Sequence, residues 1–303
     1  MIKLGKPYLM IWNRILPIMF VILWSTGFIG SKLGAPYSEP FTFLAIRFSI
    51  ASAIIVSVGL CIKMSWPKTS SQVMHTIIAG ILIHGIYLGG VFWAIDDGLT
   101  AGLTALIIAL QPILMSIGAA LFLEENITSK HWIGLSLGLA GVTIVIKETM
   151  GINFNHNMLD SKGIIACIIS VIALSIGSLY QKRFCSSENV WAHQAIQLSS
   201  AAVFLISLSF IFETQNISWS TEFIVALSWL TLIMSVGTFT ILHVLIRRER
   251  TSDISNLFYM VPPTTAVMSY FFFNEKLTII ALLGILITIF GVIISSHPRW
   301  RVI

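Results

Sequence analysis

Long apolar segments separated by short polar stretches make up most of the chain and constrain its fold more than any other feature. Each segment holds about 20 residues, and a helix of that length spans the roughly 30 Å hydrocarbon core of a bilayer. The sequence therefore predicts an all-α membrane protein with ten transmembrane helices. We expect them at residues 14–33, 40–60, 73–94, 99–122, 130–147, 161–182, 190–212, 222–246, 252–273 and 277–296.

The charge content excludes the commonest classes of soluble protein. Only 10% of the residues are charged and 56% are hydrophobic, whereas soluble domains carry roughly 25% charged residues. This composition fits neither a cytosolic enzyme nor a disordered chain. The three cysteines match no metal-binding spacing, so we expect neither a metal nor another cofactor.

Lysine and arginine are distributed unequally between the two sides of the predicted membrane. With the N-terminus in the cytoplasm, thirteen of them fall on the inner side and four on the outer side. Positive charge in short loops favours the cytoplasmic side. Both termini are therefore predicted to be cytoplasmic, and the net charge of +5 requires no nucleic-acid partner.

The two halves of the chain, residues 1–150 and 151–303, align with each other without a gap at an offset of 150 residues. Each half contributes five predicted helices, and because five is odd, the second half starts on the opposite side of the membrane. The halves are therefore predicted to be inverted repeats, an architecture in which secondary transporters alternate between inward-open and outward-open states. The aligned pairs include Gly27 with Gly177, Lys32 with Lys182, Pro112 with Pro262, Glu125 with Glu275, and Gly141 with Gly291.

Several motifs carry a resemblance to a known family. The run Trp24-Ser25-Thr26-Gly27-Phe28 leads to Lys32 and then to Arg47-Phe48, and the segments that begin at Pro112 and Pro262 continue to matching glutamates and glycines. Over nearly the whole chain these features resemble two tandem units of the EamA-type transporters in the drug/metabolite transporter superfamily. The second half departs from the pattern, because Leu174 replaces Trp24 and Gln197 replaces Arg47.

The resemblance implies a fold, a compartment and a class of function. It implies ten helices around a central cavity in a bacterial inner membrane, and transport of small metabolites, often the export of amino acids or related compounds. It also implies that the helices at 130–147 and 277–296 lie away from the cavity and support a homodimer. Their glycines, Gly134, Gly138, Gly141, Gly284 and Gly291, form small-residue surfaces suited to close packing.

Polar side chains at membrane depth are costly and usually face a wet cavity or the protein interior. Arg47 either binds a substrate carboxylate, reaches up to the outer surface, or pairs with Asp96, Asp97 or Glu39. His84 either couples transport to protons, with or without the Asp96-Asp97 pair, or bonds to a neighbouring helix. We predict a cavity lined by Trp24, Phe28, Arg47, His84, Tyr87, Gln111, Gln197, Asn256, Tyr259 and Tyr270.

Prolines and glutamates mark the ends and bends of the predicted helices. Pro112 removes a backbone donor at mid-span, and Pro262-Pro263 predicts a stronger helix break. Such breaks free carbonyl groups that a wet cavity can use. Glu125 and Glu275 each precede a helix start, where a negative charge complements the helix dipole.

Together these features predict a secondary transporter of small organic metabolites that works by alternating access and exports amino acids or their derivatives. A multidrug transporter, an importer or an exchanger of the same fold is the alternative, and a channel is more remote. An intramembrane enzyme is not expected, because the chain has neither a Gly-x-Ser-Gly nor a His-Glu-x-x-His motif.

Overall fold

The computed structural model describes residues 6–97, 99, 101–150, 162–185, 189–273 and 278–296. These residues form helices joined by short turns, and the β-pairing among them is an isolated bridge between Ser38 and Ile217. The elements are α1 (Lys6–Gly34), η1 (Ala35–Tyr37), α2 (Pro40–Cys61), α3 (Ser70–Gly80), η2 (Ile81–Ile86), α4 (Tyr87–Asp96), α5 (Ala101–Ile108), α6 (Gln111–Phe122), α7 (Ser129–Met150), α8 (Lys162–Phe184), α9 (Val190–Phe212), α10 (Thr221–Trp229), η4 (Leu230–Thr238), α11 (Phe239–Arg248), α12 (Thr251–Phe273) and α13 (Ile279–Ser295).

These helices coincide with the apolar segments of the sequence. Among the described residues, six helices are long and apolar enough to cross a membrane: Pro40–Cys61, Ser70–Asp96, Ser129–Glu148, Lys162–Phe184, Val190–Phe212 and Thr221–Arg248. Shorter apolar helices cover Ile15–Ser31, Gln111–Phe122 and Ile279–Ser295. Large apolar side chains such as Phe210, Phe271 and Ile279 are exposed to 73%, 73% and 78%. Water disfavours such a surface and lipid accommodates it, so the chain is a multi-pass membrane protein.

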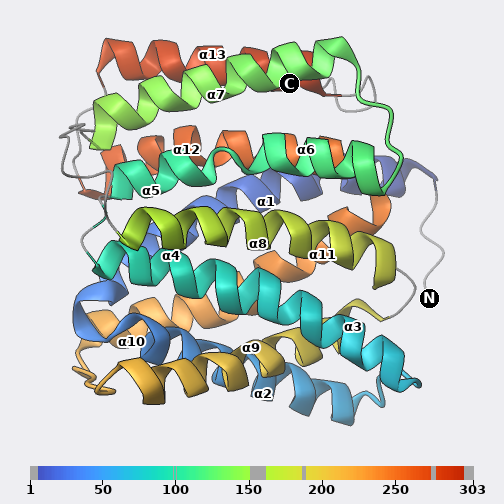
Figure 1. Ribbon diagram of the computed structural model, residues 1–303, viewed down its shortest axis with the longest axis vertical. Helices are drawn as coiled ribbons and strands as arrows, with labels where there is room; N and C mark the ends of the chain where they lie inside the picture. The colour runs from blue at the N-terminus through green and yellow to red at the C-terminus, as the bar shows by residue number, and fades with distance from the viewer. Residues whose placement is uncertain are drawn as a thin grey trace.

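Two tightly packed helix pairs lie on opposite sides of the bundle, α7 with α13 and α2 with α9, and α1, α4, α8 and α12 lie between them (Figure 1). In the α7–α13 pair the backbones touch. A Cβ added at Gly291 would lie 2.5 Å from the Gly138 nitrogen and 2.7 Å from the Gly134 oxygen. The glycine surfaces of these two helices are therefore used within the chain.

Two π-helical segments lie inside long helices at matching places in the two halves. η2 joins α3 to α4 in the helix Ser70–Asp96, and η4 joins α10 to α11 in the helix Thr221–Arg248. Shifting η2 by 150 residues gives positions 231–236, which lie within η4. π-helical turns disturb the regular hydrogen bonding of a helix and often occur at functional sites. The residues of η2 and η4 are therefore candidates for the functional site.

The two proline positions behave differently. α5 ends at Ile108 and α6 begins at Gln111, so the helix is interrupted just before Pro112. The stronger break expected at Pro262-Pro263 is absent, since α12 continues as one helix through both prolines. α12 packs against α1, α6, α7 and α13, and these contacts keep its path helical although two backbone donors are missing.

The close backbone contact between α7 and α13 predicts that a larger residue at Gly291 lowers the stability of the protein. Gly291→Ala places a methyl group against backbone atoms that cannot move aside, and overpacking of this kind costs about 1–3 kcal/mol. We expect a lower thermal midpoint for the purified protein in detergent. Gly237→Ala is the matched control, because a Cβ there meets only the Leu232 oxygen, at 3.6 Å. A Gly291→Ala protein as stable as the Gly237→Ala protein would contradict the packing described.

Candidate substrate site

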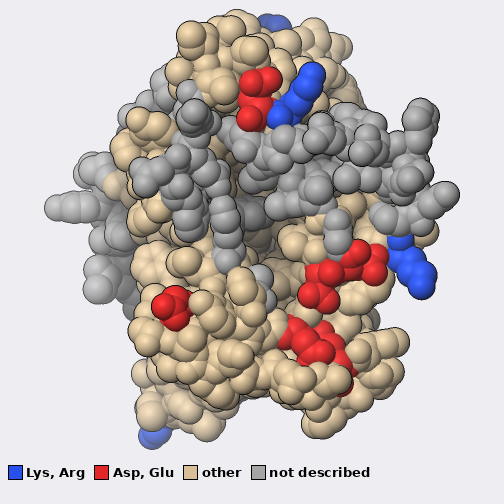
Figure 2. Space-filling view, turned by 90° about the vertical axis from the view of Figure 1, so that its left-hand side faces the viewer, with Lys and Arg blue, Asp and Glu red and all other residues tan. Residues whose placement is uncertain are grey.

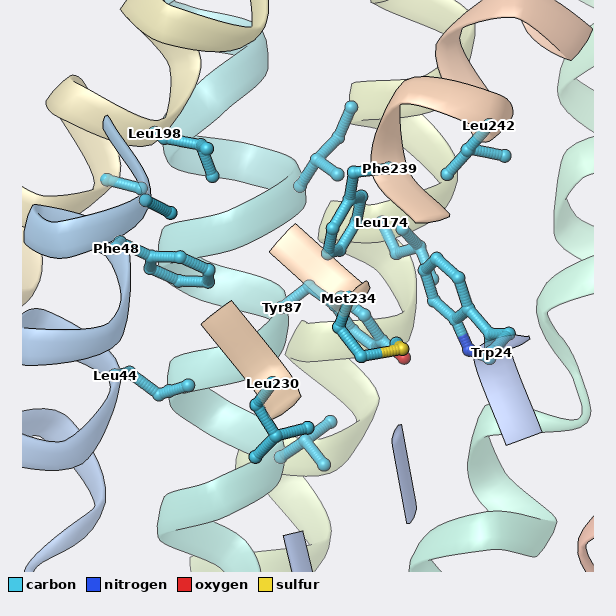
Figure 3. Packing of buried hydrophobic residues seen from close by; sticks show 14 of the residues in the cluster. Trp24, Leu44, Phe48, Tyr87, Leu174, Leu198, Leu230, Met234, Phe239 and Leu242 are labelled. Carbon is cyan, nitrogen blue, oxygen red and sulfur yellow. The ribbon is translucent and has the colours of Figure 1, made fainter. Parts of the chain in front are cut away.

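Aromatic rings from several helices meet in the interior of the bundle. Trp24 of α1 is buried, and its ring centroid lies 5.1 Å from Phe239 of α11 and 5.3 Å from Phe258 of α12, both edge-to-face. Figure 3 shows Trp24 and Phe239 among Tyr87, Met234 and Leu174. Such a wall suits the apolar part of an organic ligand. The side chain of Phe28, also predicted to line the cavity, lies outside the described residues.

Arg47 of α2 is the one predicted lining residue with a permanent charge, and it is only 2% exposed. Its Nε donates to Ser235 Oγ of η4 at 2.9 Å, and its guanidinium carbon lies 5.2 Å from the ring centroid of Phe48. Within the described residues it pairs with no carboxylate. A buried charge without a partner is strongly unfavourable, so this guanidinium is suited to an anionic ligand.

The acidic residues considered as partners of Arg47 lie elsewhere. Asp96 and Asp97 are exposed where α4 ends. Glu39 accepts hydrogen bonds from the turn after α9 instead, including one from Thr214 N at 3.0 Å. The ion pair with Arg47, one of the three alternatives for this residue, is therefore not formed, and the structure does not bring Asp96 or Asp97 to His84.

His84 lies in η2, is fully buried and sits between two rings, with centroid distances of 4.3 Å to Phe239 and 5.5 Å to Phe48. Gln197 lies close to it. Even so, neither ring nitrogen of His84 makes a hydrogen bond of ordinary geometry with a described residue. A buried polar group without a partner is costly, so the imidazole is open to a ligand or a water molecule.

Polar side chains of α9 surround this position. Gln194 donates to the Ser235 carbonyl, so Arg47 and Gln194 converge on the same residue of η4. Gln197 donates from Nε2 to Gln181 Oε1 of α8 at 3.1 Å, and its own Oε1 has no partner among the described residues. Ser235 was not among the predicted site residues, and its only signal in the sequence is a small polar side chain at mid-span, at the repeat position of Gly85.

A second group of buried polar residues belongs to α6 and α12. Gln111, Asn256 and Tyr259 are fully buried. The Gln111 Oε1, both amide atoms of Asn256 and the Tyr259 hydroxyl have no hydrogen-bond partner among the described residues. Tyr259 lies against Gly138 of α7. Unpaired polar groups of this kind suit the lining of a substrate cavity. The Tyr259 ring, however, packs toward the α7–α13 pair.

The remaining predicted lining residues divide into buried and exposed. Tyr87 is buried in the same core as Trp24. Tyr270 is 47% exposed near the end of α12, so the structure does not place it with the buried polar group of Asn256 and Tyr259. Fourteen residues of helix separate Asn256 from Tyr270, so α12 reaches from the interior to the surface between them.

Carboxylates join the two halves of the chain at both ends of the bundle. At the end where α9 finishes, Glu213 accepts from Phe41 N and Thr42 N of α2, both at 2.7 Å. At the opposite end, Glu125 accepts from Thr251 N at 2.9 Å and so caps α12. Glu125 was expected to complement the helix that follows it directly, α7. The tertiary fold gives it the free amide groups of another helix start instead.

Two matches to the EamA-like transporter family cover residues 12–147 and 161–297. The chain belongs to this family. The family recognised from the sequence motifs is thereby confirmed, and the general role is that of a membrane transporter. In 285 aligned residues the chain is 27% identical to the uncharacterized transporter YvbV of Bacillus subtilis, covering 91% of this chain and 89% of that protein.

Two further similarities are more distant. A probable amino-acid metabolite efflux pump of Escherichia coli is 21% identical, with 95% of this chain and 96% of that protein covered. A solved crystal structure superposes with a TM-score of 0.80 over 93% of this chain and 96% of that chain at 19% identity, which supports the fold alone. The relatives are named as transporters and efflux pumps.

The hydrogen bonds between Glu39 and the turn after α9 should make the stability of the protein depend on pH. Burial opposes ionisation of the Glu39 carboxyl, but the hydrogen bonds from Thr214 and Asn216 outweigh it and leave the pKa below its usual value of 4.5. The carboxylate therefore stabilises the fold above that pH, and the contribution disappears as the pH falls through the lowered pKa. We expect Glu39→Gln to have the lower thermal midpoint at neutral pH, by a margin that shrinks below pH 4.5.

The control is Glu124→Gln, because the Glu124 side chain is exposed and makes no hydrogen bond within the described residues. This variant should have the wild-type midpoint at every pH. A Glu39→Gln deficit that stays constant from neutral to acidic pH would contradict the assigned role of the carboxylate.

Proposed function

We propose that this chain is a secondary transporter that exports small carboxylate-bearing metabolites, amino acids or their derivatives, by alternating access. The observation that carries the proposal is the buried guanidinium of Arg47 without a carboxylate partner among the described residues. A substrate carboxylate supplies the bidentate partner that a guanidinium prefers. The rings of Trp24 and Phe239 accommodate an apolar side chain, or an ammonium group through cation–π attraction.

The name of the Escherichia coli relative, a probable amino-acid metabolite efflux pump, supports both the substrate class and the direction. A zwitterionic amino acid has the two groups that this interior matches, since a carboxylate suits Arg47 and an ammonium group suits the aromatic rings. The unpaired imidazole of His84, beside the same rings, is available to bind a further polar group of the substrate.

We further propose ten membrane-spanning helices in two inverted repeats, residues 1–150 and 151–303. Equivalent glycines support the repeat, since Gly27 of α1 contacts Met234 in η4 and Gly177 of α8 contacts Ile83 in η2. The opposite directions of α1 and α8 support the inversion. α1 ends beside α10, at the end of the bundle where α9 finishes, whereas α8 ends beside the start of α12.

The charges at the two ends of the bundle support an orientation in the membrane. We call the end where α4 and α9 finish the acidic face, because it carries Glu39, Asp96, Asp97 and Glu213 (Figure 2). We call the end where α8 finishes and α12 begins the basic face, because it carries Lys182, Arg183, Arg247 and Arg250. By the positive-inside rule the basic face is cytoplasmic, as expected for cytoplasmic termini in a bacterial inner membrane.

A homodimer remains part of the proposal, with one restriction from the packing. The glycines of α7 and α13 are already occupied in the contact between these two helices. A second copy would therefore have to bind their outward surfaces, where Ile133, Leu283 and Phe290 are exposed.

The test is a counterflow assay in proteoliposomes loaded with an amino acid and given the radiolabelled compound outside. We expect saturable exchange of carboxylate-bearing compounds and none of their neutral amides. Arg47→Gln should lower the exchange about tenfold or more, because hydrogen bonds to charged groups contribute about 1.5–3 kcal/mol. Arg248→Gln is the matched control, since Arg248 is exposed at the end of α11. Full exchange by the Arg47→Gln protein would contradict the assigned site.

A further inference from the structure

A narrow pocket opens just beneath the basic face. It is lined by Gln181, Cys185, Val190, His193, His243 and Arg247. His243 of α11 is 2% exposed, and neither of its ring nitrogens has a hydrogen-bond partner among the described residues. An unpartnered buried imidazole is costly, and the pocket as it stands has no room for a water molecule that could pair with it.

Hydrogen bonds lead from the pocket lining toward the candidate site. Gln181 of the pocket accepts from Gln197 of α9, and Gln194, three residues earlier on the same helix, donates to Ser235, which also bonds to Arg47. His193 is held by Thr76, with 2.8 Å between its Nδ1 and the Thr76 hydroxyl. Glutamines of α8 and α9 therefore connect the lining of the pocket with the partner of the buried guanidinium.

Side chains close the basic face above this pocket. The Lys182 ammonium at the end of α8 donates to the carbonyl oxygens of Ile246 and Glu249, where α11 ends. Arg247 donates from the other side to the Cys185 carbonyl at 3.2 Å. The last carbonyls of a helix have no partner within it and attract cations, so Lys182 fixes the end of α11 against α8.

We propose that this pocket is the cytoplasmic mouth of the transport path, and that Lys182 is the gating residue that holds it closed in this structure. The inference rests on the proposed alternating access, because a carrier needs a closure that forms on one face and releases in the other state. The repeat partner of Lys182 is Lys32, which the inverted repeat assigns to the opposite face.

Cys185 reports on this closure without any substrate. It is buried in the closed pocket, as Cys167 is buried elsewhere in α8, whereas Cys61 is exposed. In a Cys61→Ser background we measure the rate of maleimide labelling of Cys185 and Cys167 in the purified full-length protein. Lys182→Gln removes the charged donor, and we expect Cys185 to label about tenfold faster or more. Cys167 should stay protected.

Two variants separate the gate from a general loss of structure. Lys32→Gln, a matched change at the repeat position, should leave Cys185 protected. Labelling of Cys167 in the Lys182→Gln protein would mean that this variant has unfolded. In that case Lys182→Met is used instead, because methionine keeps an apolar side chain and lacks the donor. A wild-type labelling rate of Cys185 in a folded Lys182→Gln or Lys182→Met protein would overturn the gate. Because no transport is measured, that result would leave the proposed carrier function standing.

Discussion

A hydrocarbon solvent offers no hydrogen bonds, and this constraint governs every level of the structure. The chain satisfies its backbone groups within helices, which leaves the few buried polar side chains as the exceptions that need an explanation. One group of them lies around η2, η4 and α9, where Arg47 and Gln194 both donate to Ser235 and neither ring nitrogen of His84 has a hydrogen-bond partner among the described residues. Open polar groups in such a core are costly, and they fit the proposed ligand site.

The two halves of the chain share their helix packing but differ in the polar side chains they contribute to the candidate site. Glycine contacts recur in both halves, and so do the π-helical segments, because both halves must pack in the same way. The chemistry does not recur. Gln197 stands at the repeat position of Arg47, and Met234 stands at that of His84. The charge and the titratable group therefore come from the first half, and the second half supplies Ser235 as a partner. In the proposed alternating-access cycle, the repeated scaffold reorients one asymmetric site.

Depth in the membrane is predictable from sequence, and contact partners are not. Long apolar runs give the positions of the helices because their length is a local property. The partner of Glu125 is the start of α12, which lies 126 residues further along the chain. The continuity of α12 through Pro262 depends on the helices around it. Arg47 was recognised from its charge alone, but the partner it actually has, Ser235, lies 188 residues away and depends on the packing of α2 against η4.

The hydrogen bonds that join helices at the acidic face and at the basic face differ in how easily they can be broken. Glu213 and Glu39 join α2 to α9, a pair already held together along its length by close packing, so opening there would expose a large apolar surface. Lys182 joins α8 to α11, which touch each other much less. Its acceptors are carbonyl oxygens rather than a carboxylate, so releasing them leaves no unpaired buried anion behind. A contact that has little apolar packing behind it and leaves no stranded charge can open and close repeatedly at low cost in free energy. The α2–α9 pair lacks the first property, so in the proposed cycle it serves as the fixed support.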